Sequence, residues 1–339
     1  MSHLPKLPLS VLELASVGVG STVRQSLLNM IDLAQHLEAK DFNRFWLAEH
    51  HNMPGIASSA PSILIGQVAA ATKKIRVGSG GVMLPNHAPL VVAEQFGTLE
   101  ALFPGRIDLG LGRAPGTDQA TARALRRSED ALSADDFPEQ LGELMGFFKG
   151  TWPAGHPYAQ ITAVPGLGHG PPIWLLGSSG YSAQVAAALG MPFAFAHHFS
   201  AENTLPALAL YRKNFRPSAI LARPYAMIAV QVICAETDEK AQYLAGPIAL
   251  SFLRLREGRP GQLPTPEEAA AFPYSPGQRA AIAQRQADQA VGSPPSVKKR
   301  LAELLEATKA DELMVTTLVH AHADRVKSYD LLHGLFSPT

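Results

Sequence analysis

The sequence predicts an α/β fold, a (β/α)8 TIM barrel with insertions after its fourth and seventh strands. Short apolar runs rich in β-forming residues alternate with longer helical patterns from end to end, which is typical of βαβ units and a parallel sheet. There are eight such runs, the strand count of this barrel, and most are followed by polar or glycine-rich residues. The 339 residues fit one barrel domain over 1–339, although length alone also allows two domains.

The first four units follow one another closely. After the apolar run at 9–15 and a Gly/Ser loop, apolar residues recur every three to four positions, which predicts a helix. The predicted strands of this half are 9–15, 45–48, 75–78 and 107–111, and the predicted helices are 23–39, 63–71 and 89–103.

Two excursions interrupt the second half. The first holds one or two helices within 118–150, and the second, at 247–295, is rich in proline and contains an Ala/Gln-rich stretch at 278–290. The remaining predicted strands are 173–176, 193–196, 227–234 and 312–317, and the remaining predicted helices are 182–189, 203–215 and 296–308.

Composition excludes several functional classes. The chain has 29 Lys and Arg against 29 Asp and Glu and is 17% charged, so it lacks the basic surface that binds nucleic acid or an anionic membrane. No apolar run approaches the roughly 20 residues that cross a bilayer, and the N-terminus has no signal-peptide pattern. The single cysteine, Cys234, cannot form an intramolecular disulfide. We therefore expect a soluble, cytoplasmic protein.

A doubly wound dinucleotide-binding sheet is the alternative fold, because Gly110 and Gly112 follow a predicted strand. The fingerprint requires a third glycine three residues after the second, where this chain has Pro115 and places glycine at Gly116 instead. The spacing therefore favours the barrel.

Barrel enzymes carry their chemistry at the C-terminal ends of the strands, and part of a surplus of twelve histidines lies there. We expect these strand ends to converge on one polar mouth. They are Glu49-His50-His51, Ser79-Gly80-Gly81, Gly112-Arg113, Gly177-Ser178-Ser179-Gly180, His197-His198 and the pair His320 and His322.

The turn Gly177-Ser178-Ser179 suits a phosphate, because hydroxyls and backbone amides meet there at the start of a predicted helix. An ordinary helix cap would also favour serine and glycine. Arg113, after a neighbouring strand, could supply the fixed charge that a phosphate monoester needs, or it could be a surface arginine in a salt bridge.

Glycines inside an apolar run, as in Ser79-Gly80-Gly81, mark either a simple bulge or a close approach of the backbone to a ligand such as a flat ring. Glu49, His50 and His51 could serve in proton transfer. Since successive strand side chains point oppositely, we expect only one of these two imidazoles to face the site.

The other histidines have weaker signals. His197 and His198 either line the same pocket or pack with neighbouring phenylalanines. A metal-dependent hydrolase barrel would place a His-x-His pair on its first strand, whereas here that spacing occurs only at His320 and His322. The sequence therefore predicts no catalytic metal.

Four segments, taken together and in this order, resemble the bacterial luciferase-like flavin-dependent monooxygenase superfamily, and within it the single-chain luciferase-like oxidoreductases. The resemblance covers nearly the whole chain. The segments are Trp46-Leu47-Ala48-Glu49-His50-His51, Arg76-Val77-Gly78-Ser79-Gly80-Gly81-Val82-Met83-Leu84-Pro85, Pro104-Gly105-Arg106-Ile107-Asp108-Leu109-Gly110-Leu111-Gly112-Arg113, and Leu176-Gly177-Ser178-Ser179 ahead of Leu189-Gly190-Met191-Pro192.

This resemblance implies a barrel that binds FMN at its C-terminal mouth. Arg113, Ser178 and Ser179 match positions that hold the flavin phosphate, flanked here by Gly112 and Gly177. The long segment after the seventh strand matches the region that covers the site.

The resemblance also implies which residues lie near the flavin ring and support its chemistry. Gly80-Gly81 matches a pair joined by a non-proline cis peptide beneath the isoalloxazine ring, and His50 matches a histidine that supports the reduced and oxygenated flavin, with Glu49 and His51 beside it. Where the luciferase catalytic subunit has a reactive cysteine this chain has Gly112, which argues against light emission.

The expected activity is that of an FMN-dependent oxidoreductase, a two-component monooxygenase that takes reduced FMN from a partner flavin reductase and uses O2 on a small organic substrate. The resemblance also implies a homodimer. Two alternatives remain: hydride transfer with the deazaflavin F420, and a non-catalytic flavin-binding subunit. Retention of His50 and Arg113 argues against the second.

Overall fold

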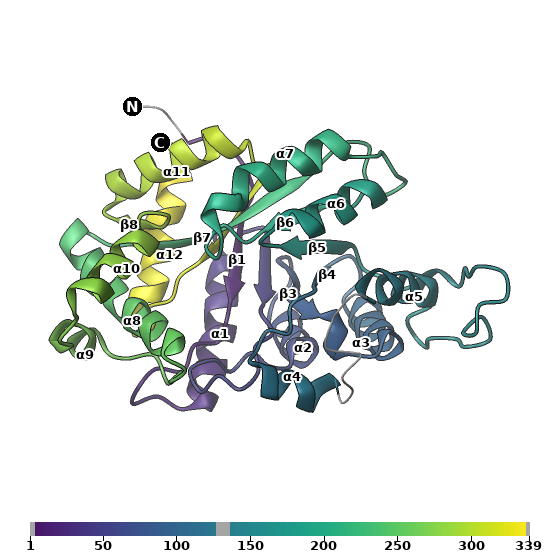
Figure 1. Ribbon diagram of the computed structural model, residues 1–339, viewed down its shortest axis with the longest axis horizontal. Coiled ribbons are helices and arrows are strands. Elements are labelled where there is room, and N and C mark those ends of the chain that lie inside the picture. Colours follow the sequence, from purple (N-terminus) through teal and green to yellow (C-terminus); the bar gives the residue numbers. More distant parts are fainter. Residues whose placement is uncertain (1–3, 127–135, 337–339) are drawn as a thin grey trace.

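Eight parallel strands close into a barrel with helices on its outside (Figure 1). The computed structural model describes residues 4–126 and 136–336. Each strand pairs in parallel with the next, and the barrel closes because β9 pairs with both β7 and β1. The barrel strands are β1 (Leu9–Glu13), β2 (Arg44–Leu47), β3 (Arg76–Met83), β4 (Ile107–Gly112), β5 (Ile173–Gly177), β6 (Phe193–Phe195), β7 (Ala226–Cys234) and β9 (Glu312–Thr316). The predicted TIM barrel is confirmed.

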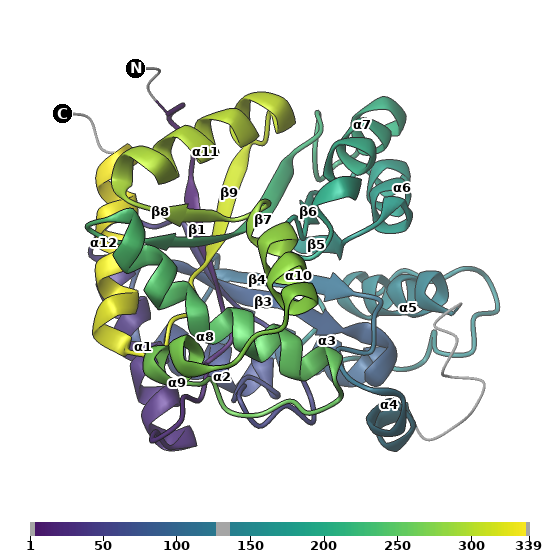
Figure 2. The ribbon, with the colours of Figure 1, turned by 60° about the vertical axis from the view of Figure 1, so that its left-hand side comes forward.

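The helices cover the barrel and build its two insertions (Figures 1 and 2). Those that follow barrel strands are α1 (Val23–Glu38), α2 (Pro61–Ala71), α3 (Pro89–Leu102), α6 (Gly180–Leu189), α7 (Thr204–Asn214), α8 (Asp238–Arg256) and α12 (His322–Phe336), and α11 (Pro294–Thr308) precedes the last barrel strand. The insertion after β4 holds α4 (Gln119–Arg126) and α5 (Phe137–Lys149), and the one after β7 holds α9 (Pro266–Ala271) and α10 (Pro276–Gln286). Residues 127–135 of the first predicted excursion lie outside the described residues.

Local sequence explains the first helix. Thr22 caps α1 by accepting a hydrogen bond from the Gln25 amide, which satisfies one of the free N–H groups at the helix start. The residues of α1 that recur at helical spacing, among them Met30, Leu33 and Leu37, are fully buried against the barrel. Amphipathic spacing and capping therefore agree on the start and orientation of this helix.

A charged cluster closes the bottom of the barrel. Arg44 of β2 donates to Asp108 of β4 over 2.6 Å and to Glu312 of β9 over 2.9 Å, and Arg76 of β3 also donates to Asp108 over 2.6 Å. Both carboxylates are fully buried. Buried charges persist only when paired, and this cluster lies at the N-terminal ends of the strands, away from the end where barrel enzymes carry their chemistry, so its role is structural.

The middle of the barrel is filled by apolar side chains. Trp46 of β2 and Trp174 of β5 meet edge to face with ring centroids 5.2 Å apart, beside Leu12, Met227 and Met314. The described side chains therefore fill the barrel at this level, and barrels of this kind carry their chemistry above such a layer, at the C-terminal mouth.

Strand β3 extends beyond its predicted end, through the glycine pair to Met83. Its register against β4 shifts between Gly80 and Val82, and the Gly80–Gly81 peptide bond is cis. A side chain at Gly81 would place its Cβ 2.7 Å from the Gly110 carbonyl oxygen. Both glycines are thus explained in part by a bulge and by close packing within the barrel itself.

The second insertion differs from its prediction in two ways. The predicted start at Pro247 lies inside α8, whose buried apolar residues, including Leu244 and Leu250, hold the helix together through the proline. Residues Ala290–Gly292 form an additional short strand, β8, which pairs with the end of β7. No helix within 4–126 and 136–336 combines the length and apolar character that crossing a bilayer requires.

Candidate functional site

The predicted phosphate corner lies where β4 and β5 end. Arg113, the residue after β4, places its guanidinium carbon 4.0 Å from the centroid of the Tyr181 ring in the first turn of α6. Ser179 is the N-cap of α6, yet its side chain makes no capping hydrogen bond, and Ser178 and Ser179 are exposed. The corner combines a cation held on an aromatic face with hydroxyls and the positive end of a helix dipole, which is an arrangement that favours an anion.

Two further predicted residues flank this corner. Gly177 ends β5 and lies against Ser182, since a Cβ there would be 2.8 Å from the Ser182 Cβ. Gly112 ends β4 and packs against Met83, whose sulfur would be 2.7 Å from an added Cβ. Close packing therefore requires a small residue at Gly177, whereas at Gly112 the neighbour is the flexible end of the Met83 side chain.

Glu49 lies in a buried cluster behind the mouth. Its carboxylate accepts hydrogen bonds from His51 Nε2 at 2.9 Å, His87 Nε2 at 2.9 Å and the Met83 amide at 3.1 Å. Burial alone would raise the pKa of the Glu49 carboxyl, but these hydrogen bonds together with the charge of His87 lower it to about 2. Glu49 and His51 are thus engaged with each other, and the carboxylate ties the end of β2 to the end of β3.

His50 has different surroundings from its neighbour. Its Nδ1 lies 3.3 Å from the Gly116 carbonyl oxygen, which can only accept, so Nδ1 carries the proton and Nε2 is an acceptor when the ring is neutral. Burial lowers the pKa of His50 below its usual 6.5. The two adjacent imidazoles, which lie beyond the end of β2, therefore make separate contacts.

His198 after β6 is arranged like His50. Its Nδ1 donates to the Ala229 carbonyl oxygen at 3.0 Å, and its pKa is lowered to about 4 by burial, with smaller contributions from Arg285, His197 and His50. The two histidines follow the C-terminal ends of β2 and β6, two strands that stand on opposite sides of the barrel. Both are neutral at pH 7 and offer Nε2 as a hydrogen-bond acceptor.

The last two histidines of the predicted mouth make contacts at its rim. His320 Nε2 bonds to the Val19 carbonyl oxygen at 2.9 Å, and His322, the first residue of α12, contacts Asp32 of α1 at 2.8 Å. The structure therefore uses this pair to join the last helix to the first unit of the barrel.

Two inward polar side chains form a part of the mouth that sequence reasoning missed. Gln231 of β7 and Thr316 of β9 are register partners and follow the alternation of the inward-facing Ala229 and Met314. The Gln231 Nε2 and the Thr316 Oγ1 are buried with no hydrogen-bond partner among the described residues. Orphaned buried polar groups are costly, which marks this spot as one that a polar ligand edge would complete.

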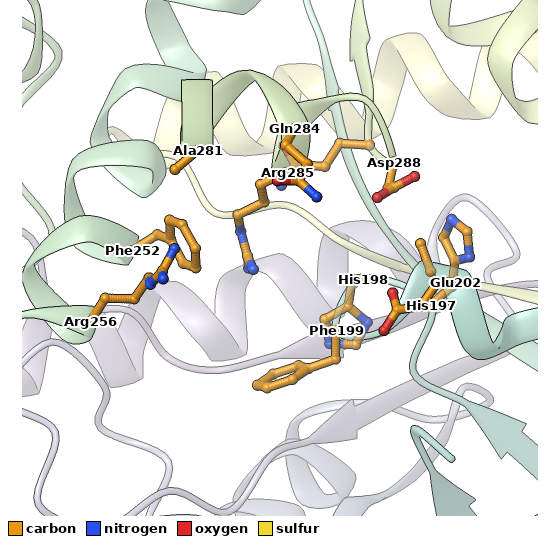
Figure 3. Close-up of a pocket in the computed structure, with 12 residues that line it drawn as sticks. His197, His198, Phe199, Glu202, Phe252, Arg256, Ala281, Gln284, Arg285 and Asp288 are labelled. Carbon is orange, nitrogen blue, oxygen red and sulfur yellow. The ribbon is translucent and has the colours of Figure 1, made fainter. Parts of the chain in front are cut away.

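A cavity of about 180 Å³ lies beside His198, between the loop after β6 and helices α8 and α10 (Figure 3). Arg285 of α10 reaches into it next to Phe252 of α8.

Sequence reasoning also missed Arg285, His87 and Tyr181. A polar residue at an inward position of an apolar strand was the available signal for Gln231, whereas these three depend on contacts that the sequence does not display.

Within the ranges that the structure describes, no group of three or more His, Cys, Asp or Glu side chains has an arrangement that could hold a metal ion.

Comparisons with known proteins place the chain in a family. The sequence profile described as luciferase-like monooxygenase matches residues 8–312. The Bacillus subtilis (strain 168) protein YvbT is 54% identical over 324 residues, 96% of this chain and 95% of that protein. The luciferase-like monooxygenase of Escherichia coli (strain K12) is 48% identical over 322 residues, 95% of each chain. The N-acetyl-S-alkylcysteine monooxygenase of Bacillus subtilis (strain 168) is 35% identical over 96% of each.

Solved structures agree. Apo-MsnO8 has a TM-score of 0.87 at 38% identity, covering 98% of this chain and 100% of that one. Two more distant structures share only the fold. The FMN complex of the oxygenating constituent of 3,6-diketocamphane monooxygenase from Pseudomonas putida has a TM-score of 0.72 at 20% identity, covering 98% of each chain. The coenzyme F420-dependent tetrahydromethanopterin reductase of Methanopyrus kandleri has a TM-score of 0.67 at 14% identity, covering 97% of this chain and 98% of that one. The profile match and the near full-length relatives establish that the chain is an enzyme of the luciferase-like monooxygenase family.

Proposed function

We propose that the protein is an FMN-dependent monooxygenase that receives reduced FMN from a separate flavin reductase and uses O2 on a small organic substrate. The observation that carries the proposal is the phosphate corner, where Arg113 lies on Tyr181 beside the uncapped start of α6. Within this family, a monooxygenase name on full-length relatives favours oxygen chemistry.

The mouth fits both ends of this cofactor. Arg113, Ser178 and Ser179 would hold the phosphate through a guanidinium, two hydroxyls and helix amides. The unpartnered Gln231 amide and Thr316 hydroxyl would satisfy polar atoms at the edge of a ring, and the bulged Gly80-Gly81 segment offers backbone without side chains beneath it. A flat, phosphate-bearing ligand therefore meets complementary groups on three sides of the mouth.

When bound, reduced FMN supplies the electrons that activate O2. His50 presents a neutral Nε2 at the mouth, fixed by the Nδ1 contact with the Gly116 carbonyl oxygen, so it would accept or relay a proton near the reacting atoms. Glu49 and His51 would act one layer behind, by fixing the strand end from which His50 projects. The helices α8 and α10 would exclude bulk water.

F420-dependent hydride transfer is the second candidate, because two F420-dependent enzymes share the fold. The same phosphate corner would serve that cofactor, so the distinction rests on binding measurements. A non-catalytic subunit is disfavoured by the presence of His50 and Arg113 at the same mouth.

We also propose a homodimer in a reducing cytoplasm. Large apolar side chains are exposed near the starts of the neighbouring helices α2 and α3, Ile63 at 67% and Val91 at 43%. Exposed apolar surface is one feature of subunit interfaces. Light scattering on the wild type and on Ile63→Glu tests this, with a dimer expected for the first and a monomer for the second.

The proposed activity is tested by mixing stoichiometric reduced FMN and protein with air and following flavin absorbance. We expect the protein to slow re-oxidation by about 10-fold or more relative to free FMN, and His50→Ala to remove most of that protection. Re-oxidation at the rate of free FMN would contradict the proposal. His169→Ala, a change at an exposed histidine, is the matched control.

A further inference from the structure

The cavity between α10 and the loop after β6 has a cationic, aromatic end (Figure 3). The Arg285 guanidinium carbon lies 4.5 Å from the Phe252 ring centroid, and that of Arg256 lies 5.6 Å from the same centroid. Figure 3 shows Arg285 reaching from α10 into the space between Phe252 and His198. One face of the cavity therefore presents two positive charges around an aromatic ring.

The Arg285 charge has no counter-ion within the described chain. Its Nε is buried and has no hydrogen-bond partner there, and neither Arg285 nor Arg256 forms an ion pair with a described residue. Burial lowers the pKa of Arg285, and no nearby carboxylate offsets that effect. A partly buried guanidinium without a partner is costly, so its place in a cavity calls for a ligand anion.

The carboxylates of the cavity lie at its other end. Asp288 is 3.9 Å from Arg300, and Glu202 accepts a hydrogen bond from Ser200 at 2.8 Å. In Figure 3 both lie on the side of His197, across the cavity from Phe252. The two ends thus differ in sign, and an anionic ligand would be oriented with its charge toward Arg285.

We propose that Arg285 is a specificity-determining residue that binds the carboxylate of an organic-acid substrate, with the apolar part of that substrate against Phe252. The planar guanidinium can bind a carboxylate through two parallel hydrogen bonds, and the adjacent ring supplies apolar contact. This inference rests on the proposed function, because it treats the cavity beside His198 as the place of the substrate.

The carboxylate site is separate from the phosphate corner. Arg113 follows β4 and lies on a side chain of α6, whereas Arg285 belongs to α10 in the insertion after β7. The two arginines therefore make independent predictions: Arg113 for the cofactor phosphate and Arg285 for the substrate anion.

The test is calorimetric titration of the flavin-free protein with hexanoate and phenylbutyrate, each paired with its uncharged amide. We expect each acid to bind at least about 10-fold more tightly than its amide, and Arg285→Gln to remove that preference while Arg285→Lys retains part of it. Arg279→Gln, on the same helix with its side chain exposed, is the matched control and should bind as the wild type does.

Equal affinity for acid and amide, absence of acid binding, or unchanged acid binding by Arg285→Gln would each overturn the proposal. FMN affinity is measured on the same variants. Loss of FMN binding on Arg285→Gln would reassign this arginine to the cofactor and also overturn it. Acid binding is measured on the flavin-free protein. The measured affinities for the acids and amides therefore test the role of Arg285 even where the FMN proposal fails.

Discussion

The guanidinium carbon of Arg113 lies 4.0 Å from the centroid of the Tyr181 ring, so the residue after β4 rests on the first turn of α6. This contact holds a positive charge beside the turn that carries the exposed hydroxyls of Ser178 and Ser179, and within the described ranges Arg113 forms no salt bridge. The contact restricts where the guanidinium can lie, and a guanidinium can bind a phosphate through two hydrogen bonds.

Arg113→Gln should weaken FMN binding by about 10-fold or more while leaving riboflavin binding nearly unchanged, because only FMN carries the phosphate. Arg113→Lys should retain part of the affinity, since it keeps the charge but loses the planar guanidinium and its two-point contact. Fluorescence titration measures both ligands. The control is Arg223→Gln at an exposed position, and equal losses for FMN and riboflavin would argue against a phosphate contact.

Glu49→Gln should destabilise the fold at neutral pH. The folded-state pKa of about 2 lies below the ordinary value of 4.5, so the carboxylate contributes stability above pH 4.5 that is lost as pH falls toward 2, roughly 3 kcal/mol in full. Chemical denaturation of the wild type and the variant across pH measures this difference. If the free energy of unfolding of Glu49→Gln changes with pH in parallel to that of the wild type from pH 5 to pH 2, the Glu49 carboxylate does not have a lowered pKa in the folded protein.

The lowered pKa of His198 predicts that stability also changes over a second, higher range of pH. Because burial lowers its pKa from 6.5 to about 4, the unfolded chain takes up a proton between these values that the folded chain does not. Stability should therefore be complete above pH 6.5 and decline as pH falls toward 4. His198→Asn keeps a donor for the Ala229 carbonyl oxygen and should flatten this part of the curve, whereas His169→Asn should leave it unchanged. If stability of His198→Asn still declines between pH 6.5 and pH 4 as it does in the wild type, the decline does not come from His198.

Gly81→Ala should lower the free energy of unfolding by at least about 2 kcal/mol. The added Cβ would lie 2.7 Å from the Gly110 carbonyl oxygen, a backbone atom that cannot move without disturbing β4. Gly142→Ala in α5 is the opposite case, since no heavy atom lies within 4 Å of its Cβ, and it should stabilise by about 0.5–1 kcal/mol through helix propensity. Urea denaturation compares the two, and a neutral Gly81→Ala would contradict the packing argument.

The barrel strands were predictable because each is a short buried run bounded by turn residues. The predicted strand 107–111 agrees with β4 (Ile107–Gly112) to within one residue. The exceptions have local causes. The three-residue strand β8 is too short to produce a pattern, and Pro247 reads as a break although the buried face of α8 carries the helix through it.

Sequence reasoning reached the candidate site only through residues near strand ends, as with Arg113 directly after β4 and His50 shortly after β2. The contact of His87 with Glu49 joins residues 38 positions apart and depends on the turn after β3. Arg285 is surrounded in sequence by alanine and glutamine, and its importance comes from where α10 lies over the mouth. Such contacts across loops leave no periodic signal in the sequence.

The most direct test of the central claim is a binding titration of the purified protein with FMN, riboflavin and F420, followed by visible absorbance and fluorescence. The account predicts that FMN binds more tightly than riboflavin and that F420 does not displace it. Tight binding of F420 with no affinity for FMN would contradict the account.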